Sequence, residues 1–347
     1  MVSITIQNLL SECKVHGSGD AQITLTDSEL YALFCIGLRD LGWDFNAIGI
    51  EDIEKPDDDY FKIPIKWFNE LLLSHVTPKI LLDILERAYT FNEDFGLYLK
   101  NLCALHRRRV KYQRILSSQP LPQVDQIGPR SLLEYGGCDD ALLLGWMSWR
   151  KWIYDIDNRS AQETGYLFEP VLASCLGGTP VGASSSPVKR VDSNGNQTPR
   201  GRQVDCFVAG ENLAYEFKMR VTIAASGQGR FGEELSFPFE CQVAGFKPIL
   251  IVLDPTPSPR LDELKAAFEN AAGSSYIGEE AWWHINEKSG EILSIFVKKY
   301  IRPPIESIES LHQNIPPDLY LQWRDSAVLI KSPSSEYLIE RNANPNQ

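Results

Sequence analysis

Two short alternating runs constrain the fold of this chain more than any other feature. Residues 203–208 and 213–218 each alternate apolar with polar side chains, the pattern of a strand with one buried face. The four residues between them suffice for a hairpin loop. Because successive side chains of a strand project to opposite faces, Glu216 and Lys218 point to the same side. We expect the hairpin to bring Asp205 beside Glu216.

The residue types gathered by this hairpin suit a divalent cation. Two carboxylates and the backbone carbonyl of Phe217 are hard oxygen donors suited to Mg²⁺, which keeps several water ligands and contacts substrate phosphate. The ammonium of Lys218 can orient or deprotonate one such water. An exposed salt-bridge ladder is the alternative, because an acid followed by Glu-x-Lys arises by chance in a chain with 23% charged residues.

Basic side chains flank the hairpin on its N-terminal side, around a polar loop at residues 192–199. They are Lys189, Arg190, Arg200 and Arg202. Residues 189–232 hold seven Lys or Arg and four Asp or Glu, a local charge of +3, whereas the whole chain carries −12. A polyanionic partner is therefore expected to meet this region first.

The glycine-rich stretch after the hairpin is too polar for a core strand. It contains Arg220, Gln228 and Arg230, the side-chain types that read guanine and adenine edges in the major groove. We expect these side chains to face DNA bases or phosphates. A salt bridge from Arg220 to Glu233 or Glu234 is the alternative.

A second basic run, residues 107–114, places five positive charges in eight residues without an acid. It is either a further nucleic-acid patch or a solvated helix face. The sequence pI near 5.0 opposes long-range attraction to a polyanion, so local patches such as this one would have to act at contact distance.

Length and composition favour a reduced, soluble protein. The 347 residues, 43% of them hydrophobic, can bury a large core and predict two subdomains. Seven scattered cysteines without a CxxC pair indicate free thiols rather than disulfides or a zinc knuckle. No apolar run approaches 18 residues and the start lacks a leader pattern, so we expect a cytoplasmic protein.

Periodicity predicts a mainly helical first third. Apolar residues recur with helical spacing at 28–38, 67–73 and 80–87, and residues 51–59 form an acidic, solvated loop. A helical stretch to about residue 154 carries Trp146, Trp149 and Trp152, which we expect in core or dimer packing rather than base stacking.

A further helix is expected at residues 160–178, with a kink or a later start at Pro170. Glu169 lies on its apolar side and needs a partner, which a metal site or Lys218 would supply. Glu163 competes with it for that role. Residues 248–254 then read as a buried parallel strand and residues 261–268 as a helix packed on the sheet. This order predicts an α/β core.

Glu169, Asp205, Glu216 and Lys218, in that order, resemble the PD-(D/E)xK nuclease superfamily. Segments 165–169, 203–205, 215–222 and 226–230, the last reading Ser-Gly-Gln-Gly-Arg, resemble more closely the ApaLI-like type II restriction endonucleases. The match covers roughly residues 130–285 and adds Thr222 and Ser226 to the expected DNA contacts. Gln203-Val204 replaces the proline that often precedes the first acid.

The resemblance implies a PD-(D/E)xK fold, an α/β mixed central sheet flanked by helices. It also implies Mg²⁺ held by Asp205, Glu216 and the Phe217 carbonyl, with Glu169 as a further ligand and Lys218 positioning water. The DNA contacts would be Lys189, Arg190, Arg202, Arg220, Thr222, Ser226, Gln228 and Arg230. Cleavage would leave 5′-phosphate and 3′-hydroxyl ends at a palindrome, with GTGCAC as the candidate site.

A homodimer with two-fold symmetry would match such a palindrome, and a cognate DNA methyltransferase would act in the same prokaryotic cytoplasm. We expect a helical region at 1–130 for support, dimer or DNA contact, a nuclease domain at 131–310 and an extension at 311–347. The alternatives are a repair or recombination nuclease acting on structured DNA, or a hydrolase using paired carboxylates, for instance on a glycoside.

Overall fold

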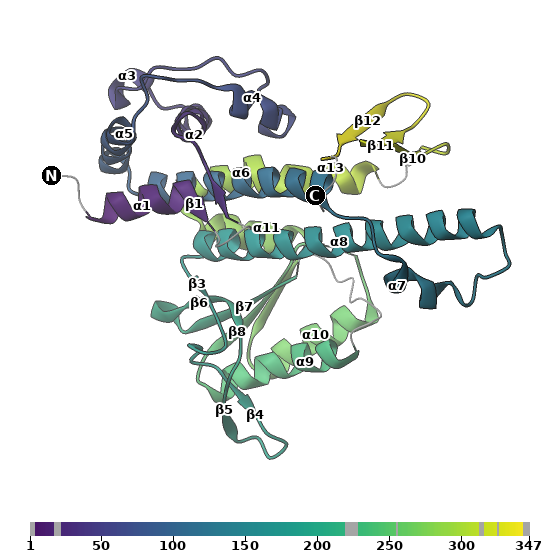
Figure 1. Cartoon of the computed structure of the whole chain (residues 1–347). Helices are drawn as coiled ribbons and strands as arrows, with labels where there is room; N and C mark the ends of the chain where they lie inside the picture. Colours follow the sequence, from purple (N-terminus) through teal and green to yellow (C-terminus); the bar gives the residue numbers. More distant parts are fainter. Residues whose placement is uncertain are drawn as a thin grey trace. The chain divides into compact units, whose positions relative to one another are not determined.

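The computed structural model describes residues 4–16, 22–218, 228–254, 256–311, 316–324 and 326–342. The chain forms two units (Figure 1). Unit 1 comprises residues 1–165 and 303–347, and unit 2 comprises residues 166–302. In the described part of the chain, no helix has the length and apolar character needed to cross a membrane.

Unit 1 is mainly helical, as its periodicity predicts. Its helices are α1 (Ile4–Lys14), α2 (Asp27–Leu41), α3 (Phe45–Ile48), α4 (Ile65–Glu70), α5 (Pro78–Phe91), α6 (Asp94–Ser118), α7 (Val124–Ile127) and the first part of α8 (Asp140–Cys175). Single 3₁₀ turns occur at Tyr60–Lys62 and Gly128–Ser131, and Val15–His16 (β1) pairs with Ile23–Thr24 (β2). Thr26 caps α2 through a capping box with Glu29.

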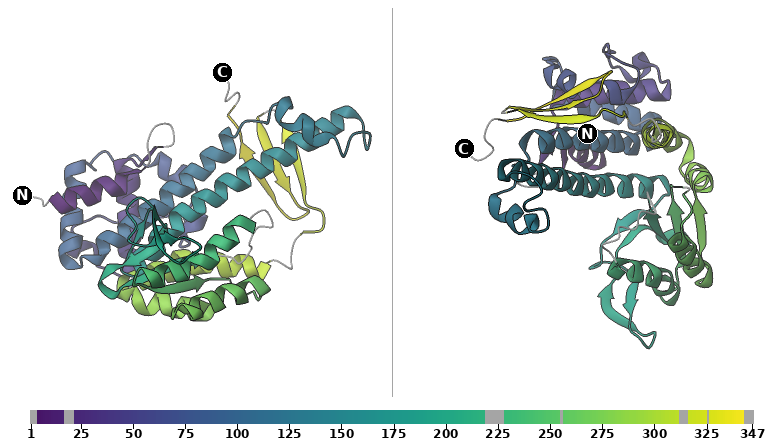
Figure 2. Two further views of the ribbon diagram at one scale, coloured as in Figure 1. Left: turned by 90° about the horizontal axis from the view of Figure 1, so that it is seen from below. Right: turned by 90° about the vertical axis from the view of Figure 1, so that its right-hand side faces the viewer.

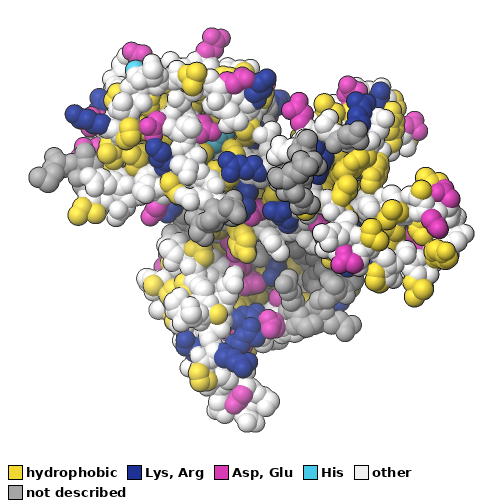
Figure 3. Space-filling view, viewed as in Figure 1, with side chains coloured by type: hydrophobic (Ala, Val, Ile, Leu, Met, Phe, Trp, Pro, Cys, Tyr) yellow, Lys and Arg dark blue, Asp and Glu magenta, His cyan; other side chains and the backbone are white. Residues whose placement is uncertain are grey.

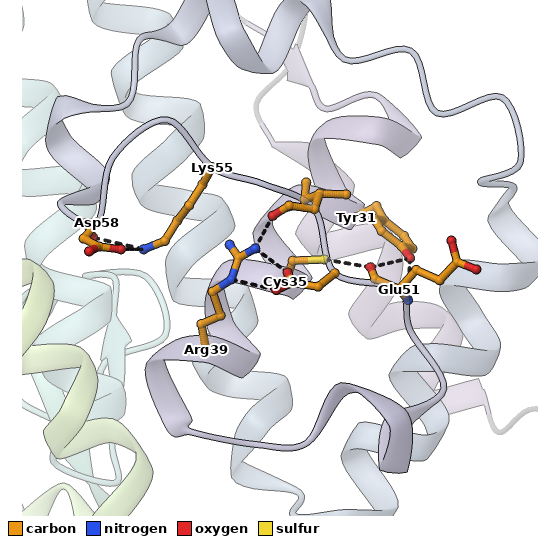
Figure 4. Close-up of polar contacts among 8 residues, drawn as sticks. Tyr31, Cys35, Arg39, Glu51, Lys55 and Asp58 are labelled. Carbon is orange, nitrogen blue, oxygen red and sulfur yellow. Dashed lines mark hydrogen bonds and ion pairs between the residues drawn. The ribbon is translucent and has the colours of Figure 1, made fainter.

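The acidic loop at residues 51–59 is held to α2 by hydrogen bonds (Figure 4). The hydroxyl of Tyr31 donates to the Glu51 carbonyl at 2.9 Å, and the Cys35 thiol donates to the same oxygen at 3.6 Å. Arg39 Nε donates to Asp52 at 3.2 Å. The loop is therefore tethered to α2, where Arg39 pairs with Asp52, while most of its acids stay exposed as expected.

Basic side chains of the run at residues 107–114, in α6, form contacts inside unit 1. Arg107 is 5% exposed and donates to the Cys13 carbonyl. Arg109 donates to the carbonyls of Tyr60 and Ile63 at 2.9 and 2.7 Å. Its guanidinium also lies over the Tyr60 ring, 4.6 Å from the centroid. These groups act as internal connectors, so this part of the run is neither the solvated face nor the nucleic-acid patch that its charge suggests.

The C-terminal segment joins unit 1 as a three-stranded antiparallel sheet. Its strands are β10 (Tyr320–Arg324), β11 (Ala327–Lys331) and β12 (Glu336–Glu340), and α13 (Arg302–Leu311) precedes them. Val328 and Ile339 of the sheet pack against Ile115 of α6 and Trp152 of α8. This packing explains why residues 311–347 belong to the N-terminal unit instead of forming the separate extension expected from the sequence.

Helix α8 runs without a break from Asp140 to Cys175, through Pro170. A proline removes one helix hydrogen bond, but Val171 and Leu172, each 1% exposed, bury apolar surface that holds the next turn in place. The helix ends at Cys175, and Gly177, whose φ is 71°, allows Gly178 N–H to donate to the Ala173 carbonyl at 2.9 Å. The expected later helix start is therefore wrong, whereas the glycine cap is confirmed.

Unit 2 is built on a five-stranded mixed sheet of order β3-β6-β7-β8-β9. The strands are β3 (Thr179–Val181), β6 (Val204–Val208), β7 (Leu213–Lys218), β8 (Lys247–Val252) and β9 (Ser274–Ile277). The first three pair antiparallel, and β7, β8 and β9 pair parallel. The hairpin and the buried parallel strand predicted from the sequence are confirmed.

Helices cover both faces of this sheet (Figures 1 and 2). Helices α9 (Gln228–Val243) and α10 (Pro259–Asn270) pack one face through Phe237 and Phe268 against Leu250. On the other face Tyr215 contacts His284 of α11 (Glu279–Lys288) at 3.2 Å, and the last turns of α8 lie nearby. Helix α12 (Gly290–Phe296) and a π-helical turn, Val297–Ile301, complete the unit. An α/β fold with a mixed central sheet flanked by helices is thus confirmed.

The polar segment at residues 192–199 is partly a strand. Lys189–Val191 (β4) pairs antiparallel with Gln197–Gly201 (β5) around a turn in which Gly195 has a φ of 81°. The division of the chain also differs from the expected one, because Gly165 within α8, rather than residue 130, separates the two units. Residues 131–165 pack with α6 and the C-terminal sheet, which places them in unit 1.

Candidate active site

The β6–β7 hairpin brings its two acids to one face of the sheet. The ladder pairs Cys206 with Tyr215, and the next position in that register sets Asp205 opposite Glu216. Directly opposed residues of an antiparallel pair project to the same face. The backbone N–H of Phe217 donates to Asp205 Oδ2 at 2.9 Å. Both carboxyl residues are nearly closed to solvent, with 8% and 9% exposure.

Lys218 joins this pair from the same strand and side. Its Nζ donates to Glu216 Oε1 at 2.8 Å and to Glu234 Oε1 of α9 at 3.1 Å. Burial alone would lower the pKa of Lys218, but the two neighbouring carboxylates raise it above its ordinary value. The side chain is therefore a firmly held ammonium rather than a free base.

The acids around this ammonium repel one another. Burial and the charge of Glu216 raise the pKa of Asp205 well above its ordinary value. Burial, followed by the charge of Glu216, likewise raises the pKa of Glu169 near the C-terminal end of α8. Lys218 offsets only part of this repulsion. The centre thus carries more negative charge than its own residues neutralise, a condition that a bound cation would relieve.

The two glutamates proposed for the helix position have different surroundings. Glu163 is paired with Arg108 and with Lys111, the latter at 2.5 Å, within unit 1. Glu169 belongs to unit 2, and its pKa responds to Glu216 and Lys218. Glu169 is therefore the glutamate that the structure associates with the hairpin acids, and Glu163 has other partners.

The donor set fits a Mg²⁺ ion that keeps water and substrate ligands. Among the described residues, no three His, Cys, Asp or Glu side chains converge into a ready-made metal cage. Mg²⁺ commonly binds through one or two carboxylates and completes its shell with water and phosphate. Asp205 and Glu216 supply that number, and their mutual repulsion favours a cation between them.

The expected DNA contacts before the hairpin differ in their accessibility. Arg190 is 39% exposed in its side chain and pairs with Glu233 at 3.0 Å. Lys189 Nζ donates to the Ser186 carbonyl at 2.7 Å. Arg202 is buried and donates to the Glu233 carbonyl at 2.7 Å, with Glu240 3.8 Å away. Arg190 can reach a ligand by exchanging partners, whereas Arg202 is bonded inside unit 2.

The remaining expected DNA contacts fall outside what the structure describes. Arg220, Thr222 and Ser226 lie outside the described residues. Gln228 and Arg230 contribute their backbone to the first turn of α9, and their side chains are outside the described part of the chain.

Glu234 is the site residue that sequence reasoning missed. The sequence offers it only as a partner of Arg220, yet it accepts a hydrogen bond from Lys218. The signal was present in its spacing, because positions 234, 237 and 241 share one face of a helix. Phe237 and Cys241 are fully buried, so Glu234, on the same face of the helix, also points at the sheet.

The fold and this centre are those of an α/β enzyme in which two buried carboxylates and a lysine lie on one β-hairpin of the sheet. Comparison with known proteins then gives the family. A model of the ApaLI-like restriction endonucleases matches residues 51–302. The type II restriction enzyme ApaLI of Acetobacter pasteurianus is 46% identical over 267 residues, 76% of this chain and 70% of that protein. No solved structure matches significantly.

The chain belongs to the ApaLI-like restriction endonuclease family. The resemblance noted in the sequence and the expected enzyme class, a type II restriction endonuclease, are both confirmed. The family match begins at residue 51 and therefore also includes much of helical unit 1. The family match thus extends beyond residues 130–285, the range of the resemblance in the sequence.

Proposed function

We propose that this protein cleaves both strands of duplex DNA at a palindromic site in the presence of Mg²⁺, leaving 5′-phosphate and 3′-hydroxyl ends. The observation that carries the proposal is the convergence of Asp205, Glu216 and Lys218 on one face of the hairpin. The mixed sheet with helices on both faces supports a PD-(D/E)xK fold for unit 2. By similarity to ApaLI, GTGCAC is the first sequence to test.

Asp205, Glu216 and the Phe217 carbonyl would hold the ion, with Glu169 as a further ligand or as a group that orients one. When bound, Mg²⁺ supplies charge stabilisation at the phosphate and lowers the pKa of coordinated water. Lys218 contributes a fixed positive charge beside Glu216, suited to a phosphate oxygen that gains negative charge during attack. Hydrolysis adds water at phosphorus and breaks the bond to the 3′ oxygen.

Glu234 would set the position of Lys218. Its carboxylate shares the ammonium with Glu216, so it draws Lys218 toward α9 and leaves part of the Glu216 carboxylate available to an ion. Among the described residues, the second Glu234 oxygen, Oε2, is buried and has no hydrogen-bond partner. An acceptor in that state favours a nearby proton donor, such as bound water, once the site is loaded.

DNA contacts are proposed for Lys189, Arg190, Arg220, Thr222, Ser226, Gln228 and Arg230. Arg202 is proposed to support them from inside unit 2, because its guanidinium already bonds the α9 backbone. A palindrome requires two symmetric cutting centres, which two copies of the chain would supply. A cognate DNA methyltransferase is the expected functional partner of such an enzyme in the cell.

The test is digestion of plasmid DNA of known sequence with Mg²⁺ or EDTA, followed by sequencing of the ends. Discrete fragments that begin with 5′-phosphate and require Mg²⁺ are expected. Asp205→Asn, Glu216→Gln and Lys218→Met should each abolish cutting while the far-ultraviolet spectrum stays unchanged. Cutting that survives EDTA would refute the proposal and favour the metal-free hydrolase.

A matched pair on one helix sharpens this test. Glu169→Gln should strongly reduce cutting, whereas Glu163→Gln should keep the activity per folded molecule, because Glu163 pairs with Arg108 and Lys111. The reverse result would show that Glu163, rather than Glu169, is the carboxylate that α8 contributes to the active site. Cleavage of branched or damaged DNA, with no discrete bands from plain duplex, would favour the repair or recombination nuclease.

A further inference from the structure

Within the part of the chain that the structure describes, the first half of α8 has one face without a partner. Its other two faces are covered within unit 1, where Leu143 and Met147 pack on Ile127 of α7. Trp152 and Ile156 pack against α6 and the C-terminal sheet. The third face therefore lacks the packing that normally buries an apolar helix stripe.

Large apolar side chains occupy this third face and the loop before it. Leu142, Trp146 and Ile153 are 65%, 54% and 44% exposed, and Leu133 and Tyr135 are 95% and 72% exposed. Figure 3 shows apolar side chains gathered on the lobe that carries α7 and the start of α8. Monomeric proteins rarely expose contiguous apolar patches larger than a few hundred Å². We call residues 132–153 of this surface the α8 face.

The spacing of the helical members favours a second helix as the occupant. Leu142, Trp146 and Ile153 lie four and seven residues apart, on the single stripe that a two-helix seam uses. Trp149, at the edge of this stripe, is half-buried near Trp323 of the C-terminal sheet. Two copies crossing antiparallel about a two-fold axis would set Leu142 of one against Ile153 of the other. The stripe thus complements itself, as an isologous interface requires.

Charge and area point the same way. Residues 132–153 hold three acids and two bases, a net charge of −1, which gives no attraction to a DNA backbone or an anionic lipid surface. Aromatic side chains offer about 150–250 Å² each, and a specific interface buries about 800 Å² per partner. A surface with residues this exposed supplies area of that order.

We propose that the α8 face is the surface through which two copies of this chain associate. The inference rests on the proposed function only for the need of a second cutting centre. The exposed stripe and its seam spacing stand independently of catalysis. The arrangement would give each dimer two hairpin centres, one from each copy, as cleavage of both DNA strands demands.

Sedimentation velocity over a concentration series, without DNA, tests the surface directly. The wild-type chain should sediment with twice its mass of 39.2 kDa. Trp146→Glu and Leu133→Glu should each weaken association by about 30-fold or more, as for hot-spot residues. Leu72→Glu is the matched control, because Leu72 is 91% exposed but lies outside the α8 face; it should leave association unchanged.

Cys138 gives a second readout that does not depend on a charged variant. It is exposed and lies in the loop just before α8, whereas the other six cysteines are buried. Its reaction with a maleimide should slow as wild-type concentration rises and should stay fast in Trp146→Glu.

The outcomes separate this inference from the proposed function. A wild-type monomer at all concentrations, or variants that associate like wild type, would overturn the α8 face even if wild type cuts DNA. Loss of DNA binding with association intact would overturn it as well and would assign the face to DNA. Association lost in the variants, with no Mg²⁺-dependent cutting by wild type, would support the face and refute the nuclease.

Discussion

Replacing Asp205 with asparagine should stabilise the metal-free protein while it destroys cutting. Asparagine keeps the shape of the side chain and an oxygen to accept the Phe217 N–H at 2.9 Å. It removes a charge that is disfavoured by burial and by Glu216, the two largest causes of the raised pKa of Asp205. Functional centres commonly hold strain of this kind at the expense of fold stability.

The sign of the pH dependence follows from the raised pKa. An acid whose folded pKa exceeds its unfolded value favours folding when protonated, and that contribution disappears as pH rises through the folded pKa. Wild type and Asp205→Asn should therefore be similar in stability below about pH 4. The variant should gain as pH rises above that value, reaching about 1–3 kcal/mol at alkaline pH, the range for relieving an unfavourable buried charge.

Urea unfolding in EDTA between pH 4 and pH 9 measures this difference. Coincident transitions from circular dichroism and fluorescence are required before one free energy is assigned, because the chain has two units. Asp192→Asn is the opposite control: hydrogen bonds from Asn196 and Asn194 lower the pKa of that exposed acid. Its replacement should give no gain at high pH.

Added Mg²⁺ supplies the second arm of the experiment. A ligand at 100 times its dissociation constant stabilises the folded state by about 2.7 kcal/mol, so wild type should gain stability on titration and Asp205→Asn should gain little. An Asp205→Asn variant that is less stable than wild type at every pH would refute the electrostatic account. If Mg²⁺ stabilised both proteins equally, Asp205 would not be a ligand of the ion.

Three further predictions concern charges inside and outside the centre. Lys218→Met should abolish cutting and lower the free energy of unfolding by about 1–3 kcal/mol, because Glu216 and Glu234 lose their shared cation; urea titration beside Lys62→Met, an exposed control, measures it. Arg109→Ala should cost about 2–3 kcal/mol through lost bonds to backbone carbonyls, without changing the salt slope of DNA binding. Arg190→Ala should reduce that slope by about one unit in a filter-binding salt series, and an unchanged slope would remove it from the contact set.

The hairpin could be predicted from the sequence because its geometry is local. Alternation places Glu216 and Lys218 on one face, and a four-residue loop sets the register that aligns Asp205. Glu234 could not be assigned in the same way. Its contact with Lys218 depends on how α9 packs on the sheet, which helical spacing indicates only once the neighbouring strand is known.

Unit boundaries were beyond sequence reasoning for a related reason. The break at Gly165 falls inside the continuous helix α8, and a helix gives no compositional sign of a boundary. The C-terminal strands join unit 1 through contacts such as Val328 with Trp152, which are far apart in the chain. Non-local packing of this kind overrides the local signal from Pro170 as well.

The count of basic residues along the sequence was a poor guide to the surface in one segment of α6. The run at residues 107–114 predicts a cationic surface, but Arg107 and Arg109 donate hydrogen bonds to backbone carbonyls inside unit 1. The carboxylates at the hairpin, in contrast, remain in excess over Lys218. On the proposed function, a chain of net charge −12 would approach DNA closely only after a divalent cation reduces that excess. Folding stability, metal binding and the approach of the phosphate would then respond to the same few carboxylates, and a variant that changes one of these properties should change the others.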